Sequence, residues 1–281
     1  MSSLPAIPKT QSNKIQMNKP EMKNKNEIRL YGKNRKHVAA NKRRYWTDIA
    51  AWNSNRQNLT GREPVRVNVT SKSKLPEFAG LSPMRIGPVA CYQENGKPVT
   101  AINLEVAWQY SKIYSHVIGD DGKLVDVRDR FLTTDAQGNP APTAEWFRWR
   151  DAAFANPCFD HRHPDFKFNK KFVRRAFPKG SQVAWWYWDG QLLDAVQARK
   201  QIYARLYERH VKSLPGFQAL RKIVARGDDL QIFDLDGYDW QALNLSPADC
   251  VRDLNHSFGH GMVLAFLLHG IRPSTMNLQT N

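Results

Sequence analysis

The sequence predicts a mainly α, α-rich α+β domain behind a basic N-terminal arm. Several segments have apolar residues at helical spacing, whereas the apolar runs of strand type are few and short. The charge is uneven: the chain has a formal net charge of +16, and residues 1–75 alone hold 17 Lys and Arg against four Asp and Glu. We therefore expect residues 1–75 to form a partly disordered arm and residues 76–281 to form the domain.

The N-terminal arm is suited to nucleic acid. Residues 1–28 have almost no large apolar side chains to offset the entropy of ordering, and we expect disorder there. In residues 28–52 basic and aromatic side chains alternate, which combines phosphate neutralisation with base stacking. Two alternatives stay open: a tail kept for solubility, and aromatic residues that dock on the domain. The candidate nucleic-acid-binding residues are Arg29, Lys33, Arg35, Lys36, Lys42, Arg43 and Arg44.

Several classes of protein are disfavoured by composition. Three widely spaced cysteines indicate neither a disulfide framework nor a paired metal motif, so a reducing, cytoplasmic location is expected. No apolar run approaches the roughly 18 residues of a membrane span. The HxH at residues 161–163 lacks a partnered cysteine, and we expect no metal and no cofactor. No pattern indicates the oligomeric state.

The first elements are expected on both sides of the boundary. Residues 53–75 are polar and turn-rich, with strand-like alternation only at Val65, Val67 and Val69. Residues 81–89 read as an extended loop that enters a short strand. Asn103 is a good N-cap for a helix that we expect to continue to about Gly119.

The later elements are predicted from the spacing of apolar residues and from the residues that cap helices. Residues 119–142 are turn-rich, and residues 161–180 are basic and aromatic, as in a loop with a short helix. Ser246 followed by Pro247 indicates a helix start. The other expected elements are helices at 144–155, 192–212, 217–225 and 261–268, a strand at 183–188, and a strand from 230 that enters a glycine turn before 240.

Three groups of residues carry possible chemistry. Glu105, Gln109 and Lys112 stand at i, i+4 and i+7, which places a carboxylate, an amide and an ammonium on one helix face. An exposed stripe with a helical ion pair would have the same spacing, and this alternative stays open.

The second and third groups lie near the C-terminus. Asp234, Asp236 and Asp239 follow the end of an apolar strand, where carboxylates serve as acids, bases or metal ligands, or simply cap a turn. In SFGHGMVLAFLLHG, glycines flank His260 at a helix start. Backbone amides at such a position can approach a phosphate.

In this order, the three groups resemble the NADAR/YbiA superfamily. Its acidic ExxxQxxK helix corresponds to Glu105, Gln109 and Lys112, and LSPMRIGPV resembles the loop before it. Trp188 resembles the family tryptophan before a long basic helix. DLDGYDW stands where the family has an acidic turn, so either Asp236 or Asp239 matches the family aspartate. FGHGMVL replaces the usual GxNxLG, and the similarity covers about residues 78–271.

The resemblance implies cleavage of an N-glycosidic bond in a ribosyl compound, including ADP-ribosyl linkages on nucleobases. A non-catalytic nucleic-acid-binding protein and a base-exchange transferase are the alternatives. We expect a nucleotide or nucleic acid as the partner, and no interaction with a membrane. The residues expected to act are Glu105, Asp236 and Asp239 in catalysis, and Trp108, Gln109, Lys112, Trp188, Gly259 and His260 in substrate binding.

Overall fold

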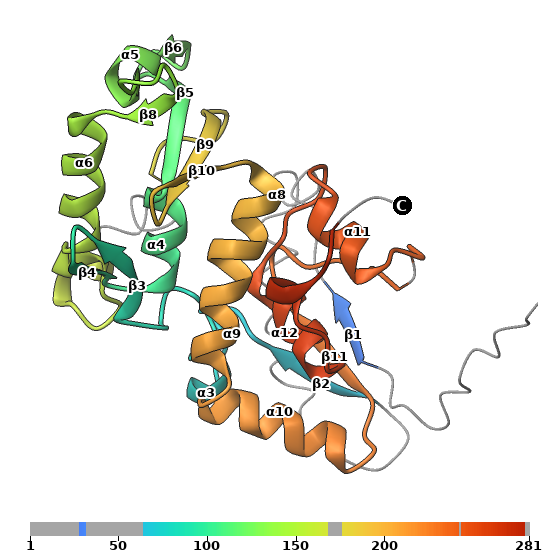
Figure 1. Cartoon of the computed structure of the whole chain (residues 1–281). Helices are drawn as coiled ribbons and strands as arrows, with labels where there is room; N and C mark the ends of the chain where they lie inside the picture. The colour runs from blue at the N-terminus through green and yellow to red at the C-terminus, as the bar shows by residue number, and fades with distance from the viewer. Residues whose placement is uncertain (1–27, 32–63, 168–175, 242, 279–281) are drawn as a thin grey trace, which may run out of the picture.

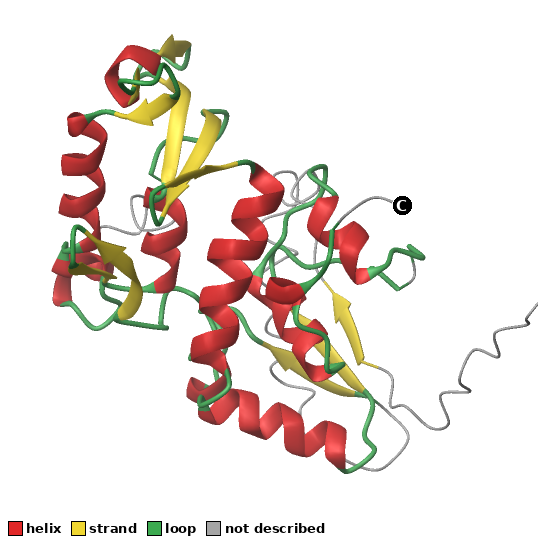
Figure 2. Cartoon of the chain, viewed as in Figure 1, coloured by secondary structure: helices red, strands yellow, loops and turns green. Residues whose placement is uncertain are grey.

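The fold has two halves on either side of a long helix (Figures 1 and 2). The computed structural model describes residues 28–31, 64–167, 176–241 and 243–278. Of these residues, 38% lie in helices and 23% in strands, so the chain is a mixed α+β protein, and the expectation of a mainly α fold overstated the helix content.

One half is built on a three-stranded parallel sheet in the order β1-β11-β2. The side chains of Leu30 in β1 and Ile232 in β11 are buried, and α12 packs against both strands. The first two strands in sequence come from residues assigned to the arm, so the folded core extends across the expected boundary after residue 75. The bounds are β1 Ile28–Tyr31, β2 Val65–Asn68, β11 Leu230–Phe233 and α12 His260–Leu268.

The other half contains a four-stranded antiparallel sheet in the order β10-β9-β5-β6, flanked by α4 and α6 (Figure 1). Its neighbouring strands β5 and β9 lie on either side of residues 119–181 in the sequence. The bounds are α4 Leu104–Tyr110, β5 Lys112–Ile118, β6 Leu124–Asp126, α6 Ala144–Phe154, β9 Gln182–Trp188 and β10 Gln191–Leu193.

The helix expected from Asn103 to about Gly119 is only half as long, so this prediction was wrong beyond Tyr110. The Ser111 hydroxyl donates to the carbonyl of Ala107 at the helix end. The next seven residues form β5, which pairs with β9. They are rich in β-branched and aromatic side chains, which suit a strand once a partner strand is present.

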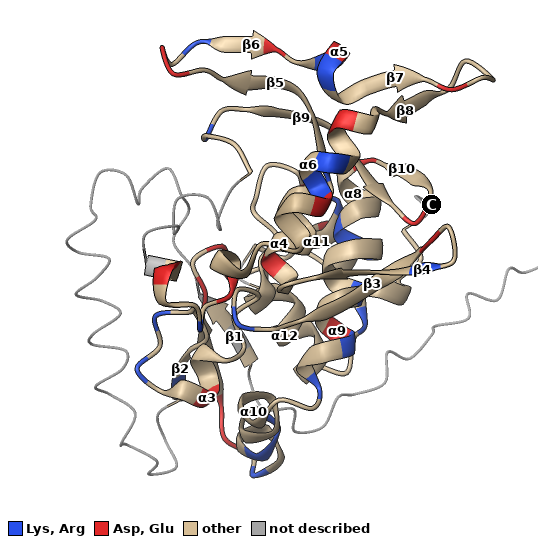
Figure 3. Cartoon of the chain, turned by 90° about the vertical axis from the view of Figure 1, so that its left-hand side faces the viewer, with Lys and Arg blue, Asp and Glu red and all other residues tan. Residues whose placement is uncertain are grey.

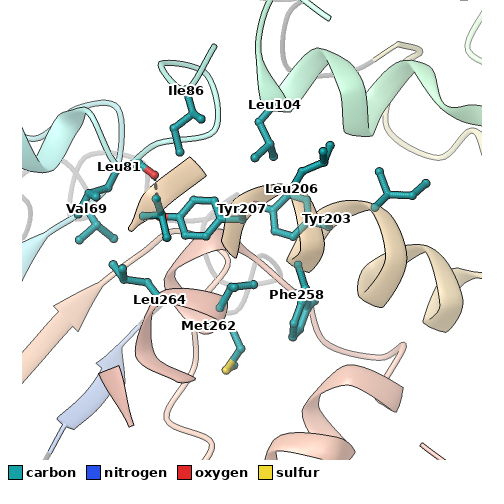
Figure 4. Close-up of a cluster of buried hydrophobic side chains, with 14 of the residues drawn as sticks. Val69, Leu81, Ile86, Leu104, Tyr203, Leu206, Tyr207, Phe258, Met262 and Leu264 are labelled. Carbon is teal, nitrogen blue, oxygen red and sulfur yellow. Dashed lines mark hydrogen bonds between the residues drawn. The ribbon is translucent and has the colours of Figure 1, made fainter. Parts of the chain in front are cut away.

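A long helix lies between the two halves. It consists of α8 (Ala195–Ala198), the π-helical η4 (Arg199–Ala204) and α9 (Arg205–Val211), in agreement with the helix expected at 192–212. It contacts α4 through η4 and α12 through α9. Figure 4 shows its apolar side chains between residues of both halves, with the Tyr207 hydroxyl donating to the carbonyl of Leu81 at 2.8 Å.

The remaining expected elements are confirmed within a few residues. The helices at 144–155, 217–225 and 261–268, the helix start at Ser246 and the strands near 183 and 230 are all present. Lys and Arg residues occur on α6 and α9 among other elements, and Asp and Glu residues are likewise spread over many elements (Figure 3). The other bounds are α3 Pro76–Ala79, β3 Val89–Glu94, β4 Lys97–Ala101, α5 Arg128–Phe131, β7 Leu132–Thr134, β8 Pro140–Pro142, η2 Pro157–Phe159, η3 Pro164–Lys167, α10 Pro215–Ala225, α11 Pro247–Arg252 and η5 Pro273–Thr275.

Within the described ranges, no helix has the length and apolar character needed to cross a lipid bilayer. Of the seven basic residues expected to bind nucleic acid, Arg29 is part of β1. The other six, Lys33, Arg35, Lys36, Lys42, Arg43 and Arg44, lie outside the described residues.

Candidate active site

The first turn of α4 is fixed by the loop of residues 81–89. The side chain of Asn103 caps the helix by accepting from the amide of Val106 at 2.8 Å. The next two amides, of residues 104 and 105, donate to carbonyls of the loop at 2.9 and 3.2 Å. Gly87 makes this contact possible, because a Cβ there would lie 2.2 Å from the carbonyl oxygen of Ile102. Glu105 is thus attached to a rigid backbone.

A chain of polar contacts extends from Glu105 along the helix. Gln109 Nε2 donates to Glu105 Oε1 at 2.9 Å, and Lys112 Nζ donates to Gln109 Oε1 at 2.6 Å. The Lys112 ammonium also lies 5.4 Å from the centre of the Trp108 ring, which is a cation–π distance. The three residues therefore share one side, as expected, although Lys112 is the first residue of β5.

The acidic turn after β11 is joined to the start of α12. Asp234 Oδ2 accepts from the amide of Gly261 at 2.9 Å and lies 3.3 Å from His260 Nδ1. The other ring nitrogen of His260 is 2.9 Å from the carbonyl oxygen of Val69. Asp234 and His260 are both buried. They anchor α12 to the sheet and to the end of β2.

The glycines beside His260 allow the turn and the helix to approach closely. A Cβ on Gly259 would lie 2.7 Å from Asp234 Oδ2 and 2.8 Å from Asp236 Cβ. A Cβ on Gly261 would lie 2.5 Å from Asp234 Cβ. The sequence suggested that these glycines admit a phosphate. In the structure their neighbours are aspartates, and the amide of Gly261 already donates to one of them.

Glu105 and Asp236 of the acidic turn are both half-buried, and their charges influence each other. Burial raises the pKa of the Glu105 carboxyl, and the negative charge of Asp236 raises it further. The hydrogen bond from Gln109 and the charges of Lys112 and His260 act in the opposite direction. Residues of α4, β5, the acidic turn and α12 are therefore close enough to interact electrostatically, although they are distant in sequence.

Tyr203 lies at the centre of this group. Burial holds the pKa of its hydroxyl well above the usual range, and the charges of Glu105, Asp234 and Asp236 raise it further. Its ring packs edge-on against Trp108 with centroids 5.2 Å apart. Tyr203 belongs to the π-helical η4, a type of segment that is frequent at functional sites. Nothing in its sequence surroundings distinguishes it from a core tyrosine.

Trp188 and Asp239 were expected to belong to the site, but each contacts a residue outside it. Trp188 packs against Tyr92 at 4.8 Å, whereas Trp186, two residues earlier on β9, stacks on Trp108 at 5.4 Å. Because residues i and i+2 share a strand face, the sequence could not separate the two tryptophans. Asp239 lies farther along the turn, where its carbonyl accepts from the amide of residue 243. Asp236 is the aspartate of the turn whose charge acts on both Glu105 and Tyr203.

The chain matches no protein-family model, no curated protein and no solved structure. Its chemistry is therefore inferred from the arrangement itself. That arrangement combines interacting carboxyl groups with an amide, an ammonium and two stacked indoles, which suits proton transfer and the binding of a polar aromatic molecule.

Proposed function

We propose that the chain is an N-glycosidase with a YbiA-like domain, and that it cleaves a ribosyl–base or ADP-ribosyl linkage in a nucleotide or nucleic acid. One observation carries the proposal: the negative charge of Asp236 in the acidic turn raises the pKa of the Glu105 carboxyl on α4, although 131 positions separate the two residues in the sequence. These are the two acidic elements on which the NADAR/YbiA resemblance rests.

The pair suits the charge changes of the reaction. Breaking an N-glycosidic bond creates an oxocarbenium-like ribose, which a nearby carboxylate stabilises, while a second carboxyl group transfers a proton to or from water or the departing base. A raised pKa suits Glu105 to the proton-transfer role. Asp236 then supplies the negative charge next to the ribose.

Neighbouring side chains can hold the rest of the substrate. Gln109 and Lys112 offer an amide and an ammonium next to Glu105, which suit ribose hydroxyls and phosphate oxygens. Trp108 and Trp186 supply an aromatic surface for a base. A base within a nucleic acid would have to be single-stranded or flipped out, and the basic N-terminal residues would hold the strand.

The test uses Glu105→Gln with Glu145→Gln as its matched control, because Glu145 lies on an exposed face of α6 and pairs with Arg130. Purified variants are incubated with nucleosides, NAD and ADP-ribosylated single-stranded nucleic acid, and released base and ADP-ribose are measured by mass spectrometry. We expect Glu105→Gln to lower the release rate by about 10²–10⁴-fold, and Glu145→Gln to retain it.

A second pair of variants identifies the other carboxylate. Asp236→Asn should lower the rate at least as strongly as Glu105→Gln, and Asp239→Asn should lower it much less, since Asp236 is the residue that acts on Glu105. Nucleic-acid affinity is measured beside the rate. Unchanged affinity with lost release supports the glycosidase.

Other outcomes favour the alternatives. Tight nucleic-acid binding with no release from any of these substrates would favour a non-catalytic binding protein. Release that requires an added free base, with that base appearing in the product, would favour a base-exchange transferase acting through the same residues.

A further inference from the structure

Two short 3₁₀ turns bring together a cysteine, a histidine and an aspartate that have no part in the proposed reaction. Cys158 lies in η2, His163 just precedes η3, and Asp165 lies within η3. One potential ligand atom from each residue lies within 4.8 Å of the other two. Cys158 and His163 are half-buried, and Asp165 is exposed.

Local hydrogen bonds hold these turns in place. The side chain of Asn156 accepts from the amide of Cys158 at 3.0 Å and caps η2. The amide of His163 donates to the carbonyl of Asp160 at 3.0 Å, which folds the chain back between the two turns. Pro157 and Pro164 begin η2 and η3, and their fixed φ angles reduce the freedom of both backbones.

We propose that Cys158, His163 and Asp165 form a binding site for Zn²⁺. A thiolate, an imidazole and a carboxylate are all ligands that zinc accepts. Three protein ligands with one exposed member leave a fourth, tetrahedral position for water. The HxH pattern alone gave no reason to expect a metal, because its cysteine partner is brought to it by the packing of η2 on η3.

The geometry is close to that of a bound ion. His163 Nδ1 lies 3.9 Å from Asp165 Oδ2. Bond lengths of about 2.0–2.3 Å place tetrahedral ligand atoms roughly 3.3–3.7 Å apart, so the three groups need to approach by only about 1 Å. Nδ1 also accepts from the amide of Asp165 at 3.2 Å, and zinc would replace that bond. Because Asp165 is exposed, the amide could then bind water.

The proposed zinc site lies next to a residue that is hydrogen-bonded to the cap of α4. The Asn103 side chain, which caps α4, also donates to the carbonyl of Phe159 at 2.7 Å, and Phe159 follows Cys158 in η2. The Phe159 ring is buried and packs near Tyr110 at the far end of α4. Zinc would thus stabilise the turn that anchors this helix. The proposal concerns the effect of the ion on this turn and is independent of the glycosidase reaction.

The test is a Co²⁺ and Zn²⁺ titration of the untagged full-length chain after treatment with a chelator. Co²⁺ should produce a thiolate-to-cobalt charge-transfer band that saturates at one equivalent, and Zn²⁺ should displace it. Cys158→Ser should abolish the band, and His163→Ala and Asp165→Asn should weaken metal affinity at least tenfold. His161→Ala, at the other histidine of the HxH, is the matched control and should bind within about twofold of the unaltered chain.

A second measurement needs no variant. Zn²⁺ should slow alkylation of Cys158 in the unaltered protein, with the site identified by peptide mass, whereas the buried Cys91 and Cys250 should show no zinc dependence. The proposal is overturned if the folded chain gives no charge-transfer band, if Cys158→Ser retains it, or if zinc leaves the alkylation of Cys158 unchanged.

Discussion

Glu105→Gln removes a negative charge from a half-buried position and preserves the size of the side chain. The substituted glutamine still offers an oxygen to Gln109 Nε2, which donates to Glu105 at 2.9 Å. The substitution therefore removes the negative charge and keeps this hydrogen bond. Because burial and Asp236 both raise the pKa of this carboxyl, the ionised form destabilises the folded state.

The size of the effect follows from the pKa. Each unit by which folding raises the pKa costs about 1.4 kcal/mol of stability once the group is ionised in both states. For a domain of 150–250 residues, 1 kcal/mol shifts the melting temperature by about 2–4 °C. The variant should therefore melt higher than the unaltered protein at neutral pH, by about 3–6 °C for each 1.4 kcal/mol by which the ionised carboxyl destabilises the folded state.

The sign depends on pH in a defined way. Below the usual pKa of 4.5, Glu105 is protonated whether the chain is folded or unfolded, and the two proteins should be equally stable. As pH rises from 4.5 through the raised folded pKa, the unaltered protein loses stability relative to the variant. Above the folded pKa the difference is constant. Melting curves recorded by circular dichroism from pH 4 to pH 8 measure this difference directly.

The control is again Glu145→Gln, because its carboxylate is exposed and paired with Arg130. A surface pair contributes at most about 1 kcal/mol, so this change should leave stability equal or slightly lower. The reasoning is refuted if Glu105→Gln melts at or below the unaltered protein at pH 7, or if the difference is the same at pH 4 and pH 8.

Three further substitutions test the packing of buried residues. Arg199→Ala removes a buried guanidinium that donates to four backbone carbonyls before α12, and urea unfolding should show a loss of about 3 kcal/mol or more. Gly261→Ala places a Cβ 2.5 Å from Asp234 Cβ, so we expect a loss of about 1–3 kcal/mol together with reduced base release. Arg150→Met leaves Glu94, 2.6 Å away, without this cation, and should cost about 3–5 kcal/mol. Adding Glu94→Gln should restore part of that stability, as measured by the same urea unfolding.

Helix starts were predictable because their signals are local. Asn103 and Ser246 each accept from a backbone amide three residues later, as the sequence around each of them indicated. The end of α4 was not predictable in the same way. The residues from Lys112 to Ile118 satisfy a helical pattern in isolation, and pairing with a strand 70 positions later decides the outcome.

The same distinction applies to the candidate site. Glu105 and Asp236 could be proposed because each lies in a short local motif. Tyr203 could not, because its role depends on which elements pack around η4. The strand β1 was also missed, since four residues are too few to show a period and its partner β11 lies 202 positions away.

The π-helical η4 sets how far α8 is rotated relative to α9 about the axis of the long helix. Each residue of an α-helix advances by about 100°, so deleting one residue between 199 and 204 would rotate everything before the deletion by that angle relative to α9. Arg199 faces the segment before α12, while Tyr207 contacts Leu81. The wide turn sets the angle between these two contacts around the helix axis, and regular winding would change that angle.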